Sequence, residues 1–272
     1  GERLREKEQD QGPGRIGPGN RRQIGGGIAG FQHVRVYASA KLAGGMDKVK
    51  VAMVGCGGFQ RYRAGNLLKV KEAEIVALVD PEAHQVDAFR EAHPSTASLP
   101  AYSDLGEMLG KEKPDAIFIA TPHTQHKGQI LEGFAHGAAV CCEKPLVTTV
   151  KDAVIAARDK AGKVGMVSYQ RHFQAEFRYI KAKIESGEAG AVQYVQVFQT
   201  QEWLRGTKGT WRQIKALSGG GQLNDSGSHV VDIVLWVTGL TPERVSAVMQ
   251  DKGTEVDINS STSIAFKGGA VG

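Results

Sequence analysis

The sequence predicts a doubly wound α/β domain, in which helices cover both faces of a parallel sheet, followed by an α+β domain. Between residues 49 and 170, apolar runs of five to eight residues alternate with stretches of helical periodicity. A glycine turn, 55–58, separates the first apolar run from the first helical stretch. After residue 170 the pattern changes to polar/apolar alternation with a period of two, which is typical of a sheet with one buried face.

The elements of the first domain follow one another with short connections. We expect strands at 49–55, 73–80, 115–122, 138–145 and 163–170, and helices at 59–70, 83–92, 104–110, 125–136 and 148–160. In a sheet of this kind, ligands bind outside the carboxyl ends of the strands. Candidate functional residues are therefore sought where the strands end.

The second domain is expected to be an open, mostly antiparallel sheet with helices. A helix is expected at 176–186 and another from about residue 224, with strands at 191–203, 243–250 and 256–266. The final stretch FKGGAVG resembles a hairpin turn, so we expect this domain to be truncated. The predicted domains are 46–170 for a nucleotide and 171–272 for substrate and oligomer contacts.

Residues 1–45 differ from the rest of the chain. They are rich in Gly, Arg and Gln with almost no apolar periodicity, so we expect a disordered or spurious extension. A twin-arginine export signal is the alternative, with Arg21-Arg22 followed by a small-residue cleavage site at 38–40. His33 interrupts the apolar stretch that such a signal needs.

Composition excludes several classes of protein. Hydrophobic residues make up 41% and charged residues 23% of the chain, as in ordinary globular proteins. No apolar run reaches the roughly 18 residues of a membrane span. The net charge is +5, but residues 1–45 hold eight basic and four acidic residues, so nucleic-acid binding is not expected. Three cysteines without a disulfide pattern favour a cytoplasmic protein.

The glycine turn carries the first two glycines of a dinucleotide-binding motif. Gly55 allows the tight turn, and Gly57 lets the backbone approach a pyrophosphate at the helix N-terminus, beside Gly58 and Phe59. Gln60 stands where the third glycine of the motif should be. A tight turn that binds no ligand is the alternative interpretation.

An acidic residue at the end of the second strand tests the dinucleotide hypothesis. Asp80 lies there and can accept hydrogen bonds from both ribose hydroxyls of NAD. A 2′-phosphate about 4 Å away would cost up to about 4 kcal/mol at an effective dielectric constant of 20. We therefore expect NAD rather than NADP. The alternative role for Asp80 is that of a helix N-cap.

Two further strand ends lie where the nicotinamide end of the cofactor is expected. These stretches supply the candidate cofactor residues Thr121, Pro122, His123 and His126, and Glu143, Lys144 and Pro145. An ammonium group held in the cleft by Lys144 could stabilise a developing alkoxide. A solvated surface lysine is the alternative.

The stretch SGGGQLNDSGSHVVDIVLWVTG supplies candidate catalytic residues. A helix beginning near residue 224 would place Asp225, His229, Asp232 and Trp236 on one face. His229 could accept a hydroxyl proton while a hydride leaves the same carbon, and Asp225 could orient it or bind a hydroxyl. A helix cap and an ordinary helix-face histidine are the alternatives. No third ligand has convincing spacing, so no metal is expected.

These features together resemble the glucose–fructose oxidoreductase/inositol dehydrogenase (Gfo/Idh/MocA) family. The resemblance covers residues 48–272 and rests on VGCGGFQR, IVALVDPE, IATPHTQH, CCEKP, YQRHF and GGGQLNDSGSHVVDIVLW in family order. It implies an N-terminal Rossmann domain, a C-terminal domain with an open sheet, and NAD(P)-dependent oxidation or reduction of sugars and polyols.

The resemblance also implies roles for individual residues. Lys144, Asp225 and His229 match the family's catalytic centre, while Glu143 and Pro145 match positions that hold the nicotinamide. Arg171 matches the family's arginine after the sixth strand, which makes it a candidate for substrate contact. Trp211 and Arg212 are further candidates, since sugars suit a cleft rich in Trp, Arg, Asp and His. Oligomers formed through the sheet are common in the family, so a homo-oligomer is expected.

Three functions fit this set of residues. The first is an NAD-dependent oxidoreductase that acts on a secondary alcohol of a sugar-like substrate, with His229 as base and Lys144 stabilising the alkoxide. The second is an NAD-dependent glycosidase that works by transient oxidation and forms no net NADH. The third is a non-catalytic sugar or NAD sensor, although a sensor has no need for all of Lys144, Asp225 and His229.

Overall fold

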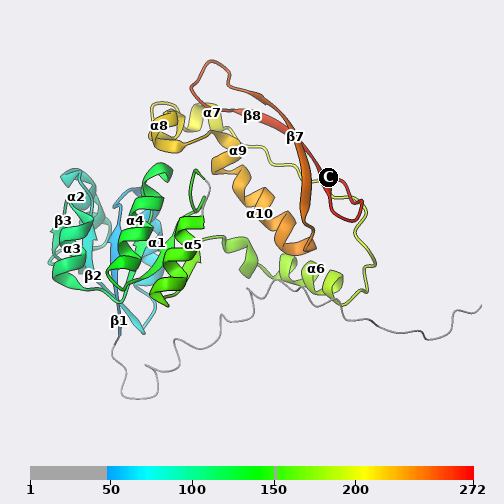
Figure 1. The fold of residues 1–272 in the computed structure, drawn as a ribbon. Helices are drawn as coiled ribbons and strands as arrows, with labels where there is room; N and C mark the ends of the chain where they lie inside the picture. Colours follow the sequence, from blue (N-terminus) through cyan, green and yellow to red (C-terminus); the bar gives the residue numbers. More distant parts are fainter. Residues whose placement is uncertain (1–47, 150–151) are drawn as a thin grey trace, which may run out of the picture. The chain divides into compact units, whose positions relative to one another are not determined.

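The computed structural model describes residues 48–149 and 152–272 (Figure 1). The expected extension and the alternative export signal in residues 1–45 lie outside the described residues. None of the helices in the described ranges is long and apolar enough to cross a membrane.

A parallel sheet forms the centre of the first domain. In the described residues it has six strands in the order β3-β2-β1-β4-β5-β6, which is the doubly wound order of dinucleotide-binding domains. The strands are β1 Val49–Val54, β2 Ala73–Val79, β3 Ala101–Tyr102, β4 Ala116–Ile119, β5 Ala139–Cys142 and β6 Gly165–Val167. The predicted parallel sheet is confirmed. Its strand order reverses between β1 and β4, so a ligand crevice is expected beyond their carboxyl ends.

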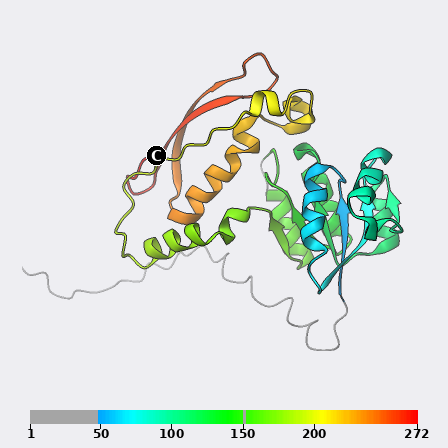
Figure 2. The ribbon, with the colours of Figure 1, turned by 180° about the vertical axis from the view of Figure 1, so that it is seen from behind.

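Helices cover both faces of this sheet (Figures 1 and 2). They are α1 Gly58–Leu67, α2 Ala83–Ala92, α3 Leu105–Glu112, α4 His126–Ala135 and α5 Asp152–Ala161, with short 3₁₀ turns η1 Pro94–Thr96 and η2 His123–Gln125. Val51 and Met53 pack in one core cluster with Phe89 of α2, whereas Ala52 and Val54 belong to a second cluster. Because both faces are buried, the strands are continuous apolar runs.

Two strands end earlier than predicted. The expected strands 115–122 and 138–145 stop at Ile119 and Cys142. Each run ends in a proline, Pro122 or Pro145, which has no N–H to donate to the ladder. Ala120 and Glu143 still donate their N–H groups to the neighbouring strands, and the chain then forms loops at the carboxyl edge of the sheet.

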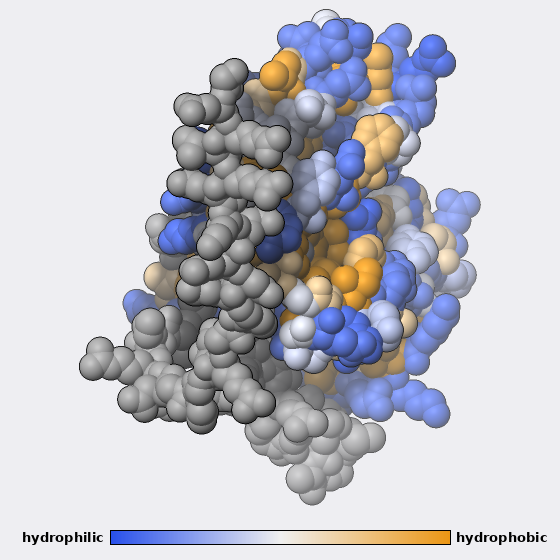
Figure 3. All heavy atoms as spheres, turned by 90° about the vertical axis from the view of Figure 1, so that its right-hand side faces the viewer, coloured by the Kyte–Doolittle hydropathy of each residue, from blue (hydrophilic) through white to orange (hydrophobic). Residues whose placement is uncertain are grey.

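The C-terminal region combines short helices with a two-stranded sheet. Its elements are η3 Gln170–Phe173, α6 Ala175–Glu185, α7 Trp203–Gly206, η4 Trp211–Gln213, α8 Lys215–Ser218, α9 Gln222–Asp225, α10 Gly227–Thr238, β7 Pro242–Gln250 and β8 Asn259–Phe266. Strands β7 and β8 pair antiparallel, as predicted. Every residue of β7 is exposed, so its alternating pattern does not correspond to a buried face. Figure 3 shows one side of the molecule, where hydrophobic residues are exposed among hydrophilic ones.

The predicted strand at 191–203 is wrong. Within this segment, Tyr194 forms a single bridge with Val271, and Trp203 already begins α7. Alternation alone does not make a strand, because each backbone N–H and C=O also needs a ladder partner. In the described residues, the backbone of the segment meets such a partner only around Val195, whose N–H donates to the carbonyl of Val271 at 2.9 Å.

Another expected strand, 256–266, begins late because Asp257 has a different role. Its carboxylate accepts hydrogen bonds from the backbone N–H groups of Gly221 (2.8 Å) and Leu223 (2.7 Å). Its carbonyl also accepts from the N–H of Gln222 at 2.8 Å. Asp257 therefore fixes the glycine segment that precedes α9.

The turn after β1 depends on one glycine. Gly55 has a φ of +84°, and a Cβ there would lie 2.9 Å from the carbonyl oxygen of Ala120. Gly57 caps α1 with a negative φ, and a Cβ there would meet nothing within 4 Å. The turn itself therefore requires glycine at position 55, whereas neither the φ angle nor the space around Gly57 requires glycine there.

The Gly55→Ala variant is expected to be less stable than the wild type by about 1–3 kcal/mol, because it forces a left-handed backbone and a close contact. This corresponds to a fall of several degrees in melting temperature. Gly57→Ala is the matched control, and its melting temperature should stay near that of the wild type. Equal melting temperatures of the two variants, measured without ligand, would contradict this account of the turn.

Candidate active site

The loop between β1 and α1 presents uncapped backbone N–H groups. No side chain caps α1, and its N-cap residue Gly57 faces open space. Asp80 follows β2, and its Oδ2 accepts a hydrogen bond from the backbone N–H of Cys56 at 2.7 Å. This bond fixes the backbone of the loop. Free N–H groups at a helix N-terminus favour an anion. The loop therefore fits the pyrophosphate of a dinucleotide.

Asp80 is not the N-cap of α2. The N-cap position is Glu82, and Asp80 Oδ1 instead accepts the backbone N–H of that residue at 2.9 Å. A carboxylate has about four lone-pair sites, so two backbone bonds leave room for ribose hydroxyls. Asp80 thus combines support of the glycine loop with spare acceptor capacity.

The side chain of Gln60 points away from the open side of the loop. It is fully buried, and its Nε2 donates to the carbonyl of Phe118 in β4 at 2.7 Å. Its Oε1 is buried without a hydrogen-bond partner. Gln60 thus takes the place of a small residue by bonding to a strand carbonyl, and only its backbone N–H belongs to the first turn of α1.

His126 joins the two loops that follow β4 and β5. Its Nδ1 lies 2.8 Å from the carbonyl oxygen of Pro145, and its Nε2 lies 3.0 Å from that of Thr121. The ring is completely buried, and burial lowers its pKa. A neutral ring can donate to one of these carbonyls only. The side chain of this predicted cofactor residue therefore holds the loops together.

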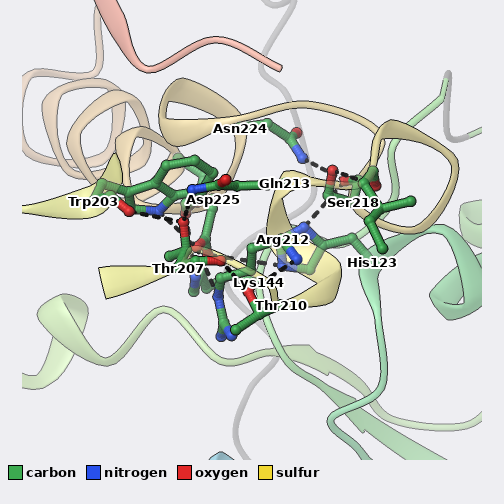
Figure 4. Close-up of polar contacts among 12 residues, drawn as sticks. His123, Lys144, Trp203, Thr207, Thr210, Arg212, Gln213, Ser218, Asn224 and Asp225 are labelled. Atoms are coloured by element: carbon green, nitrogen blue, oxygen red, sulfur yellow. Dashed lines mark hydrogen bonds and ion pairs between the residues drawn. The ribbon is translucent and has the colours of Figure 1, made fainter. Parts of the chain in front are cut away.

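Lys144 and Asp225 meet at the centre of the site (Figure 4). Lys144 Nζ donates to Asp225 Oδ1 at 2.5 Å and to the carbonyl of the same residue at 3.1 Å. Asp225 Oδ2 accepts hydrogen bonds from Trp203 Nε1 at 3.2 Å and from Arg212 Nε at 3.1 Å. Burial raises the pKa of Asp225, but Lys144, then Arg212 and His123, outweigh it and lower it to about 2.

His123 lies beside this ion pair as a neutral ring. Its Nδ1 is 3.2 Å from the carbonyl oxygen of Ser218, and its Nε2 is 3.8 Å from Asp225 Oδ1. The ring stands edge-on to Trp211, with centroids 4.7 Å apart. Burial lowers the pKa of His123 to about 3. The imidazole can therefore donate and accept hydrogen bonds without adding charge.

His229 lies in α10, one turn beyond Asp225 in the sequence. Burial, followed by the charges of Lys144 and Arg171, lowers its pKa to about 4. Its Nδ1 is buried without a hydrogen-bond partner. No hydrogen bond between Asp225 and His229 occurs in the part of the chain that the structure describes. Asp225 is bonded to Lys144 instead.

The expected single helix face is broken at Ser226. The carbonyl of Asp225 accepts from Ser228 Oγ (2.8 Å) and from Lys144 Nζ, so the N–H of His229 bonds to the carbonyl of Ser226 instead. Asp225 consequently ends α9, while the other three predicted residues lie in α10. Asp232 bonds to His172 at 2.7 Å, and Trp236 stacks on the same ring at 4.3 Å.

A cavity of about 360 Å³ brings most of the candidates together. Residues from both halves of the sequence line it: Phe59, Ala120, Thr121, His123, Glu143, Lys144, Gln170, Arg171, Gln199, Gln201, Trp211, Arg212, Asp225, Ser226 and His229. Of the predicted site residues, the glycines, Gln60, Asp80, Pro122, His126 and Pro145 are not in its wall. No cluster of metal-ligating side chains is present among the described residues.

Two supporting residues were not predicted. Trp203 is buried and donates to Asp225, and Arg63 of α1 lies with Nη2 3.2 Å from Glu143 Oε1 and 2.9 Å from Ser168 Oγ. Burial raises the pKa of Glu143, an effect that Arg63 opposes. Only this tertiary contact distinguishes Arg63 from Arg61, the other basic residue of α1. An isolated tryptophan in a polar stretch was the available signal for Trp203.

Comparison with family models identifies both halves of the chain. The model described as an oxidoreductase family with an NAD-binding Rossmann fold matches residues 49–169. The model of the GFO/IDH/MocA C-terminal domain matches residues 177–272. The chain belongs to the Gfo/Idh/MocA oxidoreductase family.

Named members of the Gfo/Idh/MocA family are moderately similar to this chain. A 2,7-anhydro-N-acetylneuraminate hydratase of Mediterraneibacter gnavus is 29% identical over 74% of this chain and 52% of its own length. Glucose-6-phosphate 3-dehydrogenase of Bacillus subtilis is 26% identical over 74% of this chain and 57% of its own length. The chain thus spans about half the length of these curated relatives.

A solved structure of the same family shares the fold. The WlbA dehydrogenase from Bordetella pertussis, in complex with NADH and UDP-GlcNAcA, is 27% identical and has a TM-score of 0.74. The match covers 84% of this chain and 66% of that one.

The Lys144–Asp225 pair should make stability depend on pH in the acid range. The pKa of Asp225 is lowered from 3.8 to about 2, which corresponds to about 2 kcal/mol of stabilisation that is present above pH 4. This contribution is lost as pH falls from about 4 towards 2. The melting temperature of Asp225→Asn should therefore lie well below that of the wild type at pH 6, and the difference should shrink below pH 4. A constant difference across this range would contradict the assigned pKa.

Proposed function

We propose that this protein is an NAD-dependent oxidoreductase that transfers a hydride between the nicotinamide and a secondary alcohol carbon of a sugar, polyol or related compound. The observation that carries the proposal is the pairing of Lys144 with Asp225 in a cavity that also contains His229. Residues 46–170 would bind the cofactor and residues 171–272 the substrate. Self-association through the C-terminal sheet stays a prediction.

The cofactor would be held by the glycine loop and Asp80. Gly55, Gly57 and the first turn of α1 suit the pyrophosphate, and the carboxylate of Asp80 suits the ribose hydroxyls. When bound, NAD supplies the acceptor for a hydride. NAD is proposed over NADP because a 2′-phosphate would face the charge of Asp80.

Lys144 would act on the oxygen of the reacting alcohol. Its ammonium is fixed at the edge of the cavity by two hydrogen bonds to Asp225 and keeps a third N–H for a ligand. A preorganised cation stabilises negative charge that develops on the substrate oxygen. Asp225 would thus position Lys144, with Arg212 and Trp203 holding the carboxylate in turn.

His229 would accept the hydroxyl proton in the oxidative direction. The burial of the ring, followed by the charges of Lys144 and Arg171, keeps it neutral near physiological pH, which leaves a ring nitrogen free to take a proton. In the reductive direction the protonated ring would return that proton to the oxygen.

Transient oxidation is the second candidate function. The relative from M. gnavus is named a hydratase, and hydration involves no net oxidation. The same three residues could serve a reaction that oxidises a carbon, changes a neighbouring bond and then restores the cofactor. Net formation of NADH distinguishes the two candidates.

Cofactor binding and turnover together test the proposal. NAD should raise the melting temperature of the protein more than NADP does, and a panel of sugars and polyols should yield NADH with at least one member. His229→Asn should retain the NAD-dependent shift but lower kcat by about 10²-fold or more. Lys144→Met should lower kcat similarly.

Three outcomes count against the proposed reaction. Product formation without net NADH favours transient oxidation. NAD binding without conversion of any compound favours the sensor. No response to either nucleotide would overturn the cofactor assignment. Gln213→Asn, which alters a residue outside the cavity wall, is the control for general effects of substitution.

As the pH is lowered, kcat/KM for oxidation should fall only near pH 4, where His229 becomes protonated. Burial and then the cations Lys144, Arg171 and Arg63 lower the pKa of His229 to about 4, and Asp225 alone raises it, so the ring stays unprotonated down to about pH 5. kcat/KM should therefore change little between pH 7 and pH 5.5, where an ordinary histidine would already be half protonated near 6.5. A halving of kcat/KM near pH 6.5, in enzyme shown to be stable at that pH, would contradict the assignment.

A further inference from the structure

The charges in the cavity wall are unequal. Lys144, Arg171 and Arg212 are cationic, and Glu143 and Asp225 are the acidic residues of the wall. The two histidines in the wall have pKa values of about 3 and about 4, so they add no charge near neutrality. Positive charge therefore exceeds negative charge around the substrate space.

Both acids already have cationic partners. Glu143 pairs with Arg63, which lies outside the cavity wall. Asp225 is shared between Lys144 and Arg212. Neither carboxylate is left to neutralise a further cation.

Arg171 is the cation without an acidic partner. No carboxylate in the described ranges forms an ion pair with it, and its polar contact is a long one, from Nη2 to Gln199 Oε1 at 3.5 Å. Burial raises the pKa of Asp232, and the charge of Arg171 has a small lowering effect on it. The carboxylate of Asp232 pairs with His172 Nε2 at 2.7 Å and not with Arg171. A half-buried guanidinium with five donors and a single weak acceptor is unusual. Carboxylates and phosphates satisfy such a group in a bidentate manner.

The surroundings of Arg171 favour an anionic ligand as well. The amides of Gln170, Gln199 and Gln201 line the same wall and can donate to further oxygens. We propose that the substrate carries an anionic group, a carboxylate or a phosphate, that binds Arg171 while its alcohol carbon lies near Lys144 and His229. This proposal rests on the proposed function, and it specifies acidic sugars as the class of substrate.

Matched sugars that differ at one carbon test this proposal. The probes are glucose, glucuronate and glucose 6-phosphate, together with the corresponding galactose set, added to the NAD-saturated protein. At least one anionic member should bind 10-fold or more tightly than its neutral counterpart by calorimetry, and this preference should weaken with added salt. Comparison of the affinities for glucuronate and glucose 6-phosphate distinguishes a carboxylate site from a phosphate site.

Substitutions assign the preference to Arg171. Arg171→Gln should weaken binding of the preferred anion at least 10-fold and binding of the neutral sugar less than 3-fold, while Arg171→Lys should restore part of the loss. Arg178→Gln removes the same charge from an exposed position on α6 and should leave the preference unchanged.

Two results would overturn the proposal. One is that neither anion binds more tightly than the neutral sugar in either set. The other is that Arg171→Gln weakens binding of neutral and anionic sugars equally. The proposed oxidoreductase activity is judged separately by NADH formation, so either result can occur while that activity stands.

Discussion

The buried pair of Lys144 and Asp225 is the interaction on which the rest of the site depends. Two charges withdrawn from water are tolerated only with good geometry and further hydrogen bonds. The indole of Trp203 and the guanidinium of Arg212 supply those bonds to the carboxylate. The pair also joins a loop of the parallel sheet to a residue 81 positions later. The same contacts take up the carbonyl that would otherwise continue the helix, so the break before α10 is part of this arrangement.

The electrostatics of the cavity follow from this pair. Asp225 remains ionised because Lys144 and Arg212 lie beside it, and burial followed by the charges of Lys144 and Arg171 keeps His229 neutral. The charge of Lys144 thus lowers the pKa of both groups, which leaves the carboxyl ionised and the imidazole uncharged. In the proposed reaction, Lys144 would be the fixed cation and His229 the available base.

Much of the fold could be predicted from the sequence, because apolar runs and helical stretches alternate and both faces of the sheet are buried. The ends of β4 and β5 were placed three residues too late, at Pro122 and Pro145, because the apolar pattern does not show where ladder pairing stops. The segment 191–203 could not be predicted from its period, because a strand depends on a partner elsewhere in the chain. Lys144, Asp225 and His229 were predicted from their motifs, and the structure brings them into the wall of one cavity. The roles of Arg63 and Trp203 could not be found in this way, because they arise only from tertiary contacts.

The contacts of Asp257 connect the outer hairpin to the reacting centre. Asp257 lies between β7 and β8, and its carboxylate and carbonyl hold three consecutive N–H groups just before Asp225. A Cβ on Gly221 would lie 1.9 Å from the Asp257 carbonyl oxygen, so the two backbones are in direct contact. Displacement of the hairpin must therefore displace α9 as well. The hairpin is therefore coupled through Asp257 to the short helix that carries Asp225, the ion-pair partner of Lys144.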